Sequence, residues 1–547
     1  MREQHADVLV VGAGPVGLTM ASELARHGVS VRIVDKQAKP LPFCRAIGVT
    51  PRSLEVLEDM GVARALIDGG VWLTGTRMEM NGAPARDVLH DFSDLPYASL
   101  GVPQYTTEAV LARHLATFGV AVERGVELTG LDLGGDHVEV GLARDGGVEA
   151  RQRFQFVVGC DGAHSLVRKA LGIGFEGSAM PAEFMLGDVR IDWDLPRGLA
   201  FRATRTAVDA PPDFLVAIPL PGKGRYRVST LAPTLPAAEQ GGEWAHGIQA
   251  DRPGPTLAEL QTVADRLLEK PARLSDLRWS SRFRISMRLA DSYGAGRAFI
   301  AGDACHIHPP TGGQGMNTGI QDAYNLAWKL ALVVRGLAAP GLLDTYGAER
   351  RAVAADVVAR TTEQSVNLGK PGAPPDRLQD TQILVHYRDG ALSVSKGGGP
   401  VPAGLRVPDV RGLRREGLNF PLRLFDLLKG PAFVLLVAGG GDGAGCEAAA
   451  AALDAEWPGL VRVITIGAAA GEQLENVEVI RDAEGEFAAV FAAAPGAAWL
   501  IRPDKYVGLD MEAWSIEAVA TYLRDTVGLR PTGETPSRPV AVGANAS

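Results

Sequence analysis

The chain has 547 residues, of which 46% are hydrophobic and 22% are charged, and its formal net charge is -9. This length accommodates about three or four domains of an ordinary globular protein. The acidic balance and the lack of a cluster of Lys and Arg argue against a nucleic-acid partner. The four cysteines show no C-x-x-C spacing, which excludes a disulfide framework and favours reduced thiols in a cytosolic protein.

The first apolar run begins at Val8 and leads into glycines rather than into a small-residue cleavage site, so no signal peptide is predicted. No uninterrupted apolar stretch reaches the ~20 residues that a membrane-spanning helix needs. We therefore expect a cytoplasmic protein that makes no membrane contact.

The N-terminal segment has the pattern of a strand, a helix and a second strand. Residues 8–11 form an apolar run, residues 16–27 have a helical pattern that stops at Gly28, and residues 30–34 are predicted as the second strand. This order is typical of the first βαβ unit of a dinucleotide-binding fold.

The glycines between the first strand and the helix each have a predicted task. Gly12 allows the tight turn, Gly14 lets a pyrophosphate approach the backbone, and Gly17 lets the helix pack on the strand. Asp35 lies about 20 residues further on, where its carboxylate accepts hydrogen bonds from a ribose and repels a 2'-phosphate. NADPH is therefore not expected at this position, and a plain glycine turn is the alternative.

The middle of the chain changes pattern and then returns to it. From about residue 184 to 230, short alternating runs separated by Pro and Gly predict an antiparallel sheet inserted into the nucleotide-binding fold. Residues 298–301 form another buried strand before a glycine-rich loop, and residues 319–336 have the apolar spacing of a helix.

A linker is predicted between residues 364 and 409, where Pro and Gly are frequent, and a further domain begins near Val401. That domain is expected to contain four strands and a closing helix from Met511 to Arg524, and the tail 531–547 is expected to be disordered. The four predicted strands span residues 433–437, 463–466, 477–480 and 498–501.

Three separated motifs together resemble the single-component FAD-dependent aromatic hydroxylases, in particular the phenol hydroxylase and pentachlorophenol monooxygenase branch. The motifs are Gly12-Ala13-Gly14-Pro15-Val16-Gly17, Cys160-Asp161-Gly162, and Gly302-Asp303-Ala304 with the glycine-rich segment that follows. Residues 498–507 resemble the end of that branch's thioredoxin-like C-terminal domain.

The resemblance implies an α/β fold with a Rossmann-like FAD-binding domain, an inserted antiparallel-sheet substrate domain and a C-terminal thioredoxin-like domain. The expected bounds are 1–180 and 286–395 for the FAD-binding domain, 181–285 for the substrate domain, 401–530 for the thioredoxin-like domain and 531–547 for the tail. Because the C-terminal domain has no C-x-x-C pair, a structural or dimer-supporting role is favoured over thiol chemistry, and a homodimer is left open.

The resemblance also assigns site residues. Asp303 is expected to bind the ribityl hydroxyls, and residues 310–317 are expected to form a loop along the flavin ring whose N–H groups stabilise negative charge. Asp161 and Arg168 resemble a segment that serves both FAD and transient NADPH or NADH. The full set of expected cofactor-binding residues is Gly12, Gly14, Pro15, Val16, Gly17, Asp35, Lys36, Arg45, Gln104, Asp161, Asp303, Pro310, Gly313, Gly315, Met316 and Asn317.

The implied reaction is hydroxylation of a small phenolic or polycyclic aromatic substrate, with O2 as co-substrate and a flavin hydroperoxide as the oxygen donor. Arg227 is the candidate catalytic residue, because it matches an arginine that governs flavin movement in relatives; an ordinary exposed strand arginine is the alternative. Ser229 stands where relatives often have tyrosine. The aspartate that phenol hydroxylase uses near its substrate is missing around Gly48, so the sequence identifies no base for a phenol.

Other interpretations remain open at this point. His306 and His308 are spaced like strand ligands, but no third ligand is suggested, so no metal is predicted. A flavin oxidase or halogenase on the same scaffold is an alternative, although no Trp-x-Trp-x-Ile-Pro motif occurs. The remaining alternative is a catalytically silent FAD-binding interaction protein.

Overall fold

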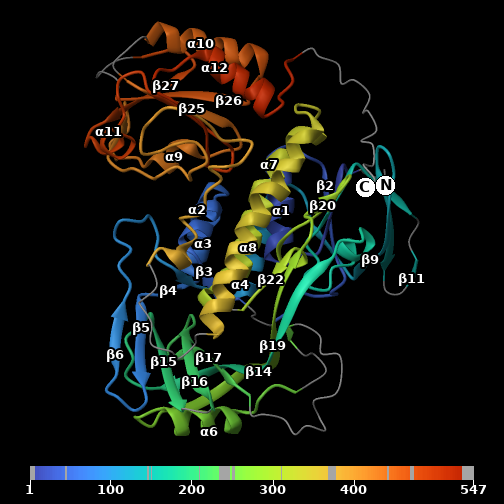
Figure 1. Cartoon of the computed structure of the whole chain (residues 1–547), viewed down its shortest axis with the longest axis vertical. Helices are drawn as coiled ribbons and strands as arrows, with labels where there is room; N and C mark the ends of the chain where they lie inside the picture. The colour runs from blue at the N-terminus through green and yellow to red at the C-terminus, as the bar shows by residue number, and fades with distance from the viewer. Residues whose placement is uncertain are drawn as a thin grey trace.

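The computed structural model places a nucleotide-binding part between a large sheet at one end and a C-terminal part at the other (Figure 1). The described residues are 6–42, 46–144, 147–148, 151–207, 210–232, 247–248, 253–309, 311–366, 377–439, 443–467 and 473–532. Arg45, Pro310 and most of the expected tail, residues 533–547, lie outside these ranges.

The nucleotide-binding part is built on a six-stranded sheet. In spatial order its strands are β20 (Gly294–Ala295), β21 (Ala298–Ile300), β13 (Phe156–Gly159), β1 (Val8–Val11), β2 (Val31–Asp35) and β8 (Val122–Arg124). The central strand β1 pairs in parallel with β2 and β13, so the carboxyl ends of these strands meet at one edge. The predicted strand at residues 8–11 is confirmed.

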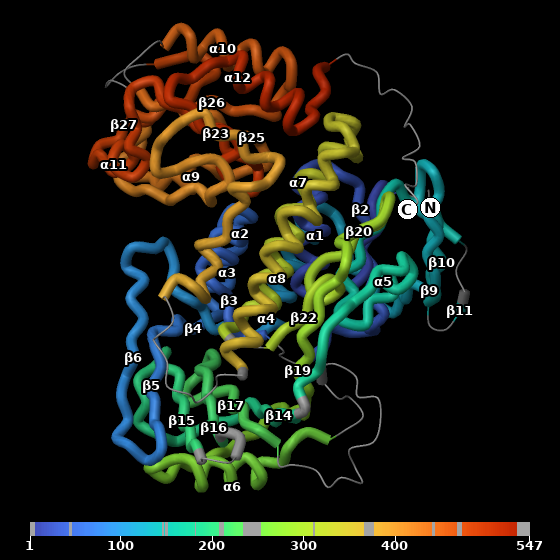
Figure 2. The backbone as a smooth tube through the Cα atoms, viewed as in Figure 1, coloured from blue at the N-terminus to red at the C-terminus, as the bar shows by residue number. Residues whose placement is uncertain are grey.

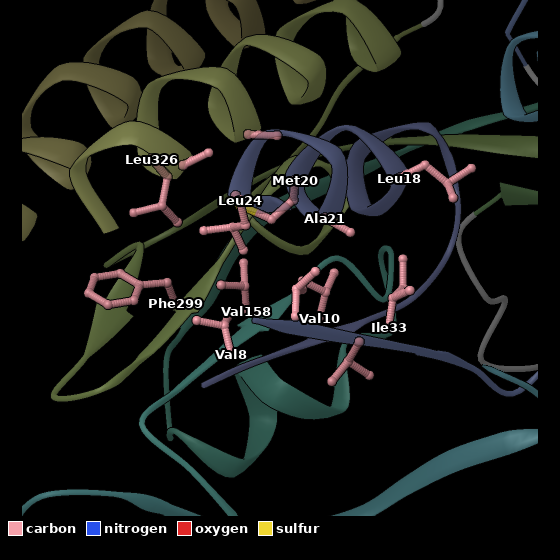
Figure 3. Close-up of a cluster of buried hydrophobic side chains, with 14 of the residues drawn as sticks. Val8, Val10, Leu18, Met20, Ala21, Leu24, Ile33, Val158, Phe299 and Leu326 are labelled. Atoms are coloured by element: carbon pink, nitrogen blue, oxygen red, sulfur yellow. The ribbon is translucent and has the colours of Figure 1, made fainter. Parts of the chain in front are cut away.

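Helix α1 (Pro15–Arg26) covers one face of this sheet. Its side chains Met20 and Leu24 lie over the strand residues Val158 and Val10, and all four are fully buried (Figure 3). Gly28 follows the helix with φ +80°, a conformation that ends helices and that glycine adopts easily. The predicted helix and its stop signal are both confirmed.

A nine-stranded, mostly antiparallel sheet forms the opposite end of the molecule from the C-terminal part (Figure 1). Two early strands, β5 (Gly75–Met80) and β6 (Arg86–Leu89), join the strands expected from the alternating sequence pattern, and β5 pairs in parallel with β15 (Leu199–Ala207). The members are β18 (Gly247–Ile248), β19 (Arg273–Ala290), β14 (Phe175–Asp192), β17 (Arg225–Leu231), β16 (Ala210–Pro219), β15 (Leu199–Ala207), β5 (Gly75–Met80), β6 (Arg86–Leu89) and β22 (His306–Ile307), which pairs with β19.

One face of the nine-stranded sheet is covered by helix α6 (Leu257–Leu267). Leu260 and Val263 of this helix join Met185, Val189 and Leu215 in one buried cluster. Because successive strand residues point to opposite faces, the strand residues that alternate with Met185, Val189 and Leu215 point away from α6.

Shorter elements surround the central sheet. They are α2 (Pro51–Asp59), α3 (Ala63–Asp68), α4 (Gln104–Thr117) and α5 (Leu166–Ala170), a three-stranded sheet of β3 (Gly48–Val49), β7 (Leu100–Gly101) and β4 (Val71–Trp72), and a four-stranded sheet of β9 (Val126–Leu133), β10 (Val138–Arg144), β11 (Gly147–Val148) and β12 (Gln152–Phe154).

Two long helices follow the return of the chain to the central sheet, α7 (Gln314–Val334) and α8 (Asp344–Val366). The expectation that α7 begins only at residue 319 is wrong, because the helix starts five residues earlier at Gln314. Gly315 and Gly319 are poor helix formers and suggest a loop. A Cβ at Gly319 would lie 2.6 Å from Val16 of α1, so glycine is needed there for helix packing.

The C-terminal part contains a seven-stranded sheet and packs with α9 (Leu424–Leu428) toward α2 (Figure 2). All four predicted strands are present, but the closing helix is shorter than expected. Met511 ends strand β29, and the helix runs from Ile516 to Thr521 before a π turn. The sheet contains β23 (Val394–Lys396), β29 (Val507–Met511), β28 (Ala498–Ile501), β25 (Phe433–Ala438), β26 (Val461–Ile466), β27 (Val477–Asp482) and β24 (Leu413–Arg415), and its helices are α9, α10 (Gly443–Glu456), α11 (Glu486–Phe491) and α12 (Ile516–Thr521).

Within the described ranges, no helix combines the length and the apolar character that crossing a membrane requires.

Candidate functional site

The turn between β1 and α1 is tightly packed at Gly12 and Gly17 but open at Gly14. A Cβ at Gly12, whose φ is +99°, would lie 2.4 Å from the carbonyl oxygen of Cys160. A Cβ at Gly17 would lie 1.9 Å from the carbonyl oxygen of Gly12, whereas one at Gly14 would meet nothing within 4 Å. Gly12 and Gly17 are therefore required by the fold, whereas Gly14 leaves free space at the N-terminus of α1.

The start of α1 also faces the second glycine segment. Pro15 is the first residue of the helix, and no side chain caps its N-terminal N–H groups. Val16 lies against Gly302, where a Cβ would come within 2.9 Å of the valine side chain. The first and third sequence motifs thus meet at the N-terminus of α1, which favours an anionic ligand.

Asp35 ends β2 and lies beside the glycine turn. Its carboxylate accepts hydrogen bonds from the backbone N–H groups of Ala13 and Gln37, both at 2.8 Å, and forms an ion pair with Arg124 at 3.2 Å. Lys36 is exposed. Asp35 therefore holds the turn in place, and its position at the end of the strand is the one expected for a ribose-binding acid.

Asp161 has a structural task that the sequence did not reveal. Its Oδ2 accepts hydrogen bonds from the N–H groups of Leu166 at 2.7 Å and Val167 at 3.2 Å, so it caps α5. Burial raises the pKa of Asp161. Arg168 donates to the carbonyl oxygen of Ala304 at 3.0 Å, which ties this segment to the one that carries Asp303.

Asp303 lies in a single 3-10 turn, Gly302–Ala304, directly after β21. Its side chain is only partly exposed, and it makes no hydrogen bond to any residue in the described ranges. This carboxylate is at the carboxyl-terminal edge of the parallel strands, where ligands bind in open α/β sheets. It is therefore available to accept hydrogen bonds from a ligand.

The glycine-rich segment after β22 forms a short turn and then the first turn of α7. Gly312 and Gly313 have φ of +70° and +66°. The side chain of Gln314 donates to the carbonyl oxygen of Asp380 at 3.1 Å. Gly315, Met316 and Asn317, which were expected in a loop, belong to the helix, so the N–H groups of its first turn are free of intrahelical partners.

The side chain of Asn317 joins this first turn to another part of the chain. Its Oδ1 accepts from the N–H of Thr50 at 3.0 Å, and its amide nitrogen donates to the carbonyl oxygens of Gly48 at 2.9 Å and Gly313 at 2.7 Å. The side chain is thus engaged within the protein, where it fixes residues 48–50 against the start of α7. The sequence carried no signal for its partner Thr50.

Gln104, the first residue of α4, supports the segment next to Arg45. Its Oε1 accepts from the N–H of Ala46 at 3.1 Å, and its amide nitrogen donates to Glu108 at 2.8 Å. Gln104 and Asn317 therefore hold the same stretch, residues 46–50, from two sides.

The two histidines of the third motif are linked to a buried ionic group. His306 contacts Asp322 at 2.7 Å, and Arg350 contacts the other oxygen of Asp322 at the same distance. The ring of His308 lies 6.3 Å from that of His306, and burial lowers the pKa of His308 to about 4. No group of three potential metal ligands occurs in the part of the chain that the structure describes.

Asp322 and Arg350 were not identified from the sequence. A usable signal was the set of polar residues at helical spacing on the otherwise apolar helix α7, where Gln321, Asp322, Asn325 and Lys329 are all buried.

Arg227 lies on β17 and is buried, with only 4% of its surface exposed. The alternative of an ordinary exposed strand arginine is therefore wrong. Its guanidinium forms two hydrogen bonds with Asp188 of the neighbouring strand, at 2.7 and 2.9 Å, and lies 5.0 Å from the ring centre of Trp279.

The face of the nine-stranded sheet that turns away from α6, here called the inner face, is rich in aromatic and apolar side chains. Phe184, Phe214 and Ile285 form a cluster on it, and the rings of Phe184 and Phe283 stack at 5.4 Å. Ile218 of the same face packs with Ile47, next to the stretch held by Gln104 and Asn317. The inner face thus looks toward the candidate cofactor site. The residues that define it are Phe184, Leu186, Asp188, Arg202, Thr204, Phe214, Val216, Ile218, Arg227, Ser229, Leu231, Trp279, Ser281, Phe283 and Ile285.

These features fit FAD. The open space at Gly14 and the uncapped N-terminus of α1 suit a pyrophosphate, Asp35 suits the adenosine ribose, and the free carboxylate of Asp303 suits a polyol chain. The free N–H groups at the start of α7 suit an electron-rich ring edge.

Comparisons with known proteins agree with this geometry. A family model described as FAD binding domain matches residues 5–361, and one described as HcaD C-terminal domain matches residues 416–526. A flavin-dependent monooxygenase of Mycobacteroides abscessus is 36% identical over 79% of this chain and 88% of its own length. Pentachlorophenol 4-monooxygenase of Sphingobium chlorophenolicum is 32% identical over 95% of this chain and 97% of its own. The crystal structure of a ternary complex of aklavinone-11 hydroxylase with FAD and aklavinone superposes with a TM-score of 0.78 at 26% identity, covering 96% of this chain and all of the other.

Proposed function

The chain belongs to the family of FAD-dependent aromatic monooxygenases, and from this premise we propose that it hydroxylates a phenolic or polycyclic aromatic compound. In the overall reaction the aromatic compound, O2, NAD(P)H and a proton give the hydroxylated product, NAD(P)+ and water. One oxygen atom enters a ring C–H bond, and the two electrons of NAD(P)H reduce the other oxygen atom to water.

The observation that carries this proposal is the position of the inner face relative to the candidate cofactor site. The inner face reaches this site through Ile218, which packs in one cluster with Ile47, next to the stretch that Asn317 of α7 holds. The aromatic cluster around Phe184 lies on the same inner face. An aromatic surface of this kind suits a flat apolar ring system.

FAD, when bound, supplies the redox and oxygen-transfer chemistry. The protein residues have three tasks. Asp303 and the Gly14 turn bind the cofactor, Asn317 and Gln104 fix the backbone along it, and the inner face orients the aromatic ring and excludes water. We propose that Arg227 acts from the inner face as a residue that controls access of NAD(P)H electrons to the cofactor.

A substrate screen tests the proposal. Purified protein reconstituted with FAD is mixed with NADPH or NADH and a panel of phenols and polycyclic hydroxyaromatics. Accelerated oxidation of the nicotinamide, together with a product heavier by one oxygen atom, is the expected result. A compound that stimulates oxidation but yields only hydrogen peroxide would instead favour an oxidase, and no stimulation by any compound would favour a silent FAD-binding protein.

We further propose a thioredoxin-like architecture for the C-terminal part. The parallel strands β25, β26 and β27 followed by the antiparallel β28 and β29 support it. The domain bounds 1–180, 181–285, 286–395 and 401–530, a cytoplasmic location and a homodimer remain predictions from the sequence.

A further inference from the structure

The inner face contains one arginine whose charge is not matched by a carboxylate. Arg202 lies on β15 and is partly buried. Its Nε donates to the hydroxyl of Thr204 at 3.3 Å, and within the described ranges its guanidinium has no other hydrogen bond and no ion pair. Two of the three nitrogens of the guanidinium are thus available to a ligand.

Other arginines of the same sheet differ in this respect. Arg225, Arg227 and Arg282 each form an ion pair with a carboxylate, at 3.4, 2.7 and 2.8 Å respectively. Burial lowers the pKa of Arg202, and no charged group of the described residues offsets this effect. A guanidinium removed from water without a counterion is costly, and a bound anion would relieve that cost.

The strand register places Arg202 in a row with the residues that a substrate on the inner face would meet. Arg202 is opposite Val216, Val216 is opposite Ser229, and Ser229 is opposite Leu186. Neighbouring strands lie about 4.8 Å apart, so the Cα atoms of Arg202 and Ser229 are separated by about 10 Å, roughly the length of two or three fused rings. Phe214 and Phe184 lie in the next row along the same face.

We propose that Arg202 binds an ionised oxygen of the aromatic substrate, a phenolate or an enolate conjugated with the ring, while the ring system lies along the row toward Ser229. This inference rests on the proposed function and defines its substrate as an acidic hydroxyaromatic. The planar fork of an arginine suits such an oxygen, and the hydrogen bonds it makes are strengthened by charge.

The proposal also accounts for the missing aspartate near Gly48. A substrate that is held as its anion loses its hydroxyl proton to solvent on binding, and a phenolate is already an electron-rich ring. No protein base is then needed to deprotonate it. Arg202 is a specificity-determining residue in this account, and its positive charge lowers the pKa of the bound hydroxyl group.

The test uses the FAD-loaded full-length protein and two probes, alizarin and its dimethyl ether, which share a tricyclic ring system but differ in acidic hydroxyls. Calorimetric titration in two buffers of different ionisation enthalpy, at a pH below the pKa of the most acidic hydroxyl of free alizarin, gives the affinity and the number of protons released. The variants are Arg202→Met, which removes the charge but keeps an unbranched side chain, and Arg202→Lys. The control is Arg205→Met on the same strand, whose side chain is on the opposite face.

The expected result is that the wild-type protein binds alizarin about 10- to 100-fold more tightly than the ether and releases a proton on binding it. Arg202→Met should lose both the preference and the proton release while it keeps its affinity for the ether. Arg202→Lys should retain part of the preference, and Arg205→Met should match the wild type. If Arg202→Met loses affinity for the ether as much as for alizarin, the substitution has damaged the inner face in general, which would contradict the proposal.

If Arg202→Met keeps the wild-type preference for alizarin and the wild-type proton release, the role of Arg202 is overturned but the monooxygenase function is not. The failure of every aromatic compound to bind or to stimulate NADPH oxidation would overturn the proposed function and the Arg202 inference together. The two failures are therefore distinguishable.

Discussion

The side chain of Asn317 accepts a hydrogen bond from the backbone N–H of Thr50 at 3.0 Å and thereby joins the start of α7 to the N-terminus of α2. Thr50 is itself the cap of α2, since its hydroxyl accepts from the N–H of Ser53. One side chain thus fixes two helix N-termini next to the candidate cofactor site.

Asn317→Ala should therefore weaken FAD binding and destabilise the protein by about 1–3 kcal/mol, because it leaves the buried N–H of Thr50 unpaired. The measurements are the dissociation constant of FAD from flavin fluorescence and a urea unfolding curve. Thr362→Ala, which removes only a bond from a hydroxyl to the carbonyl oxygen of Val358 within α8, is the control and should leave FAD binding unchanged. Full FAD affinity in Asn317→Ala would contradict the assigned role.

The glycine turn gives a matched pair of substitutions. Gly14→Val adds a side chain at a position where a Cβ would have no atom within 4 Å, so the apoprotein should keep its melting temperature. FAD affinity should fall at least about tenfold, because the added side chain fills the pyrophosphate space. Gly17→Ala places a Cβ 1.9 Å from the carbonyl oxygen of Gly12 and should cost about 3 kcal/mol or more of stability without FAD. Thermal unfolding of both apoproteins and FAD titration separate the two effects. Equal losses of stability in the two variants would count against this assignment.

Arg227 and Asp188 can be tested as a pair. Arg227→Met alone leaves the carboxylate of Asp188 buried without its partner and should cost about 3–5 kcal/mol. Arg227→Met combined with Asp188→Leu should recover much of that stability, which gives a folded protein in which stopped-flow reduction of FAD by NADPH is measurable. Slow reduction in the double variant supports the role of Arg227 in electron delivery, and wild-type reduction rates would remove that role.

A buried ionic cluster holds the C-terminal part against α7 and α8. Glu349 accepts hydrogen bonds from Arg502 at 2.6 Å and from Lys329 at 2.8 Å, and all three side chains are at most 1% exposed. Burial tends to raise the pKa of Glu349, but Arg502 and Lys329 outweigh it and hold this pKa below its usual range.

Glu349→Ala should lower the free energy of unfolding by about 3–5 kcal/mol, since two buried cations lose their shared partner. Glu456→Ala, which breaks an exposed pair with Arg524, should change it little. Urea unfolding curves of both variants check this. A small effect of Glu349→Ala would mean that the cluster does not hold the C-terminal part in place.

The stability of the protein should fall as the pH drops below neutrality, in part because of His27. Burial, assisted by Arg26, lowers the pKa of His27 from 6.5 to about 3 in the folded protein. The unfolded chain therefore takes up the proton first, so stability is complete above pH 6.5 and is lost as the pH falls toward 3. The expected slope from this group is about 1.4 kcal/mol per pH unit. His27→Gln should show a shallower decline between pH 6.5 and 5, and an unchanged slope in unfolding curves would show that another group is responsible.

Local sequence patterns were sufficient for the elements that depend on local physics. The strand Val8–Val11, the stop of α1 at Gly28 and the placement of Asp303 after a buried strand follow from apolar runs and glycine chemistry. The start of α7 was missed because Gly315 and Gly319 lower helix propensity. Gly319 is nevertheless needed in the helix, because it packs closely on Val16.

Long-range pairs could not be predicted in the same way. The pairing of Arg227 with Asp188 depends on the register of two strands that are far apart in sequence, and the bond between Asn317 and Thr50 depends on how α7 approaches α2. A single sequence contains no local signal for either contact. Asp161 is a related case, since its motif position predicted a ligand contact but gave no sign that the same carboxylate also caps α5.

Product analysis under isotopically labelled dioxygen shows directly whether the protein inserts an oxygen atom of O2 into the aromatic ring. The FAD-loaded protein is incubated with NADPH, a stimulating hydroxyaromatic from the screen and labelled dioxygen, and the product is examined by mass spectrometry. We expect a product with one labelled oxygen atom on the ring and one equivalent of NADPH consumed per product. A ring oxygen derived from water, or NADPH consumption that yields only labelled hydrogen peroxide, would contradict it.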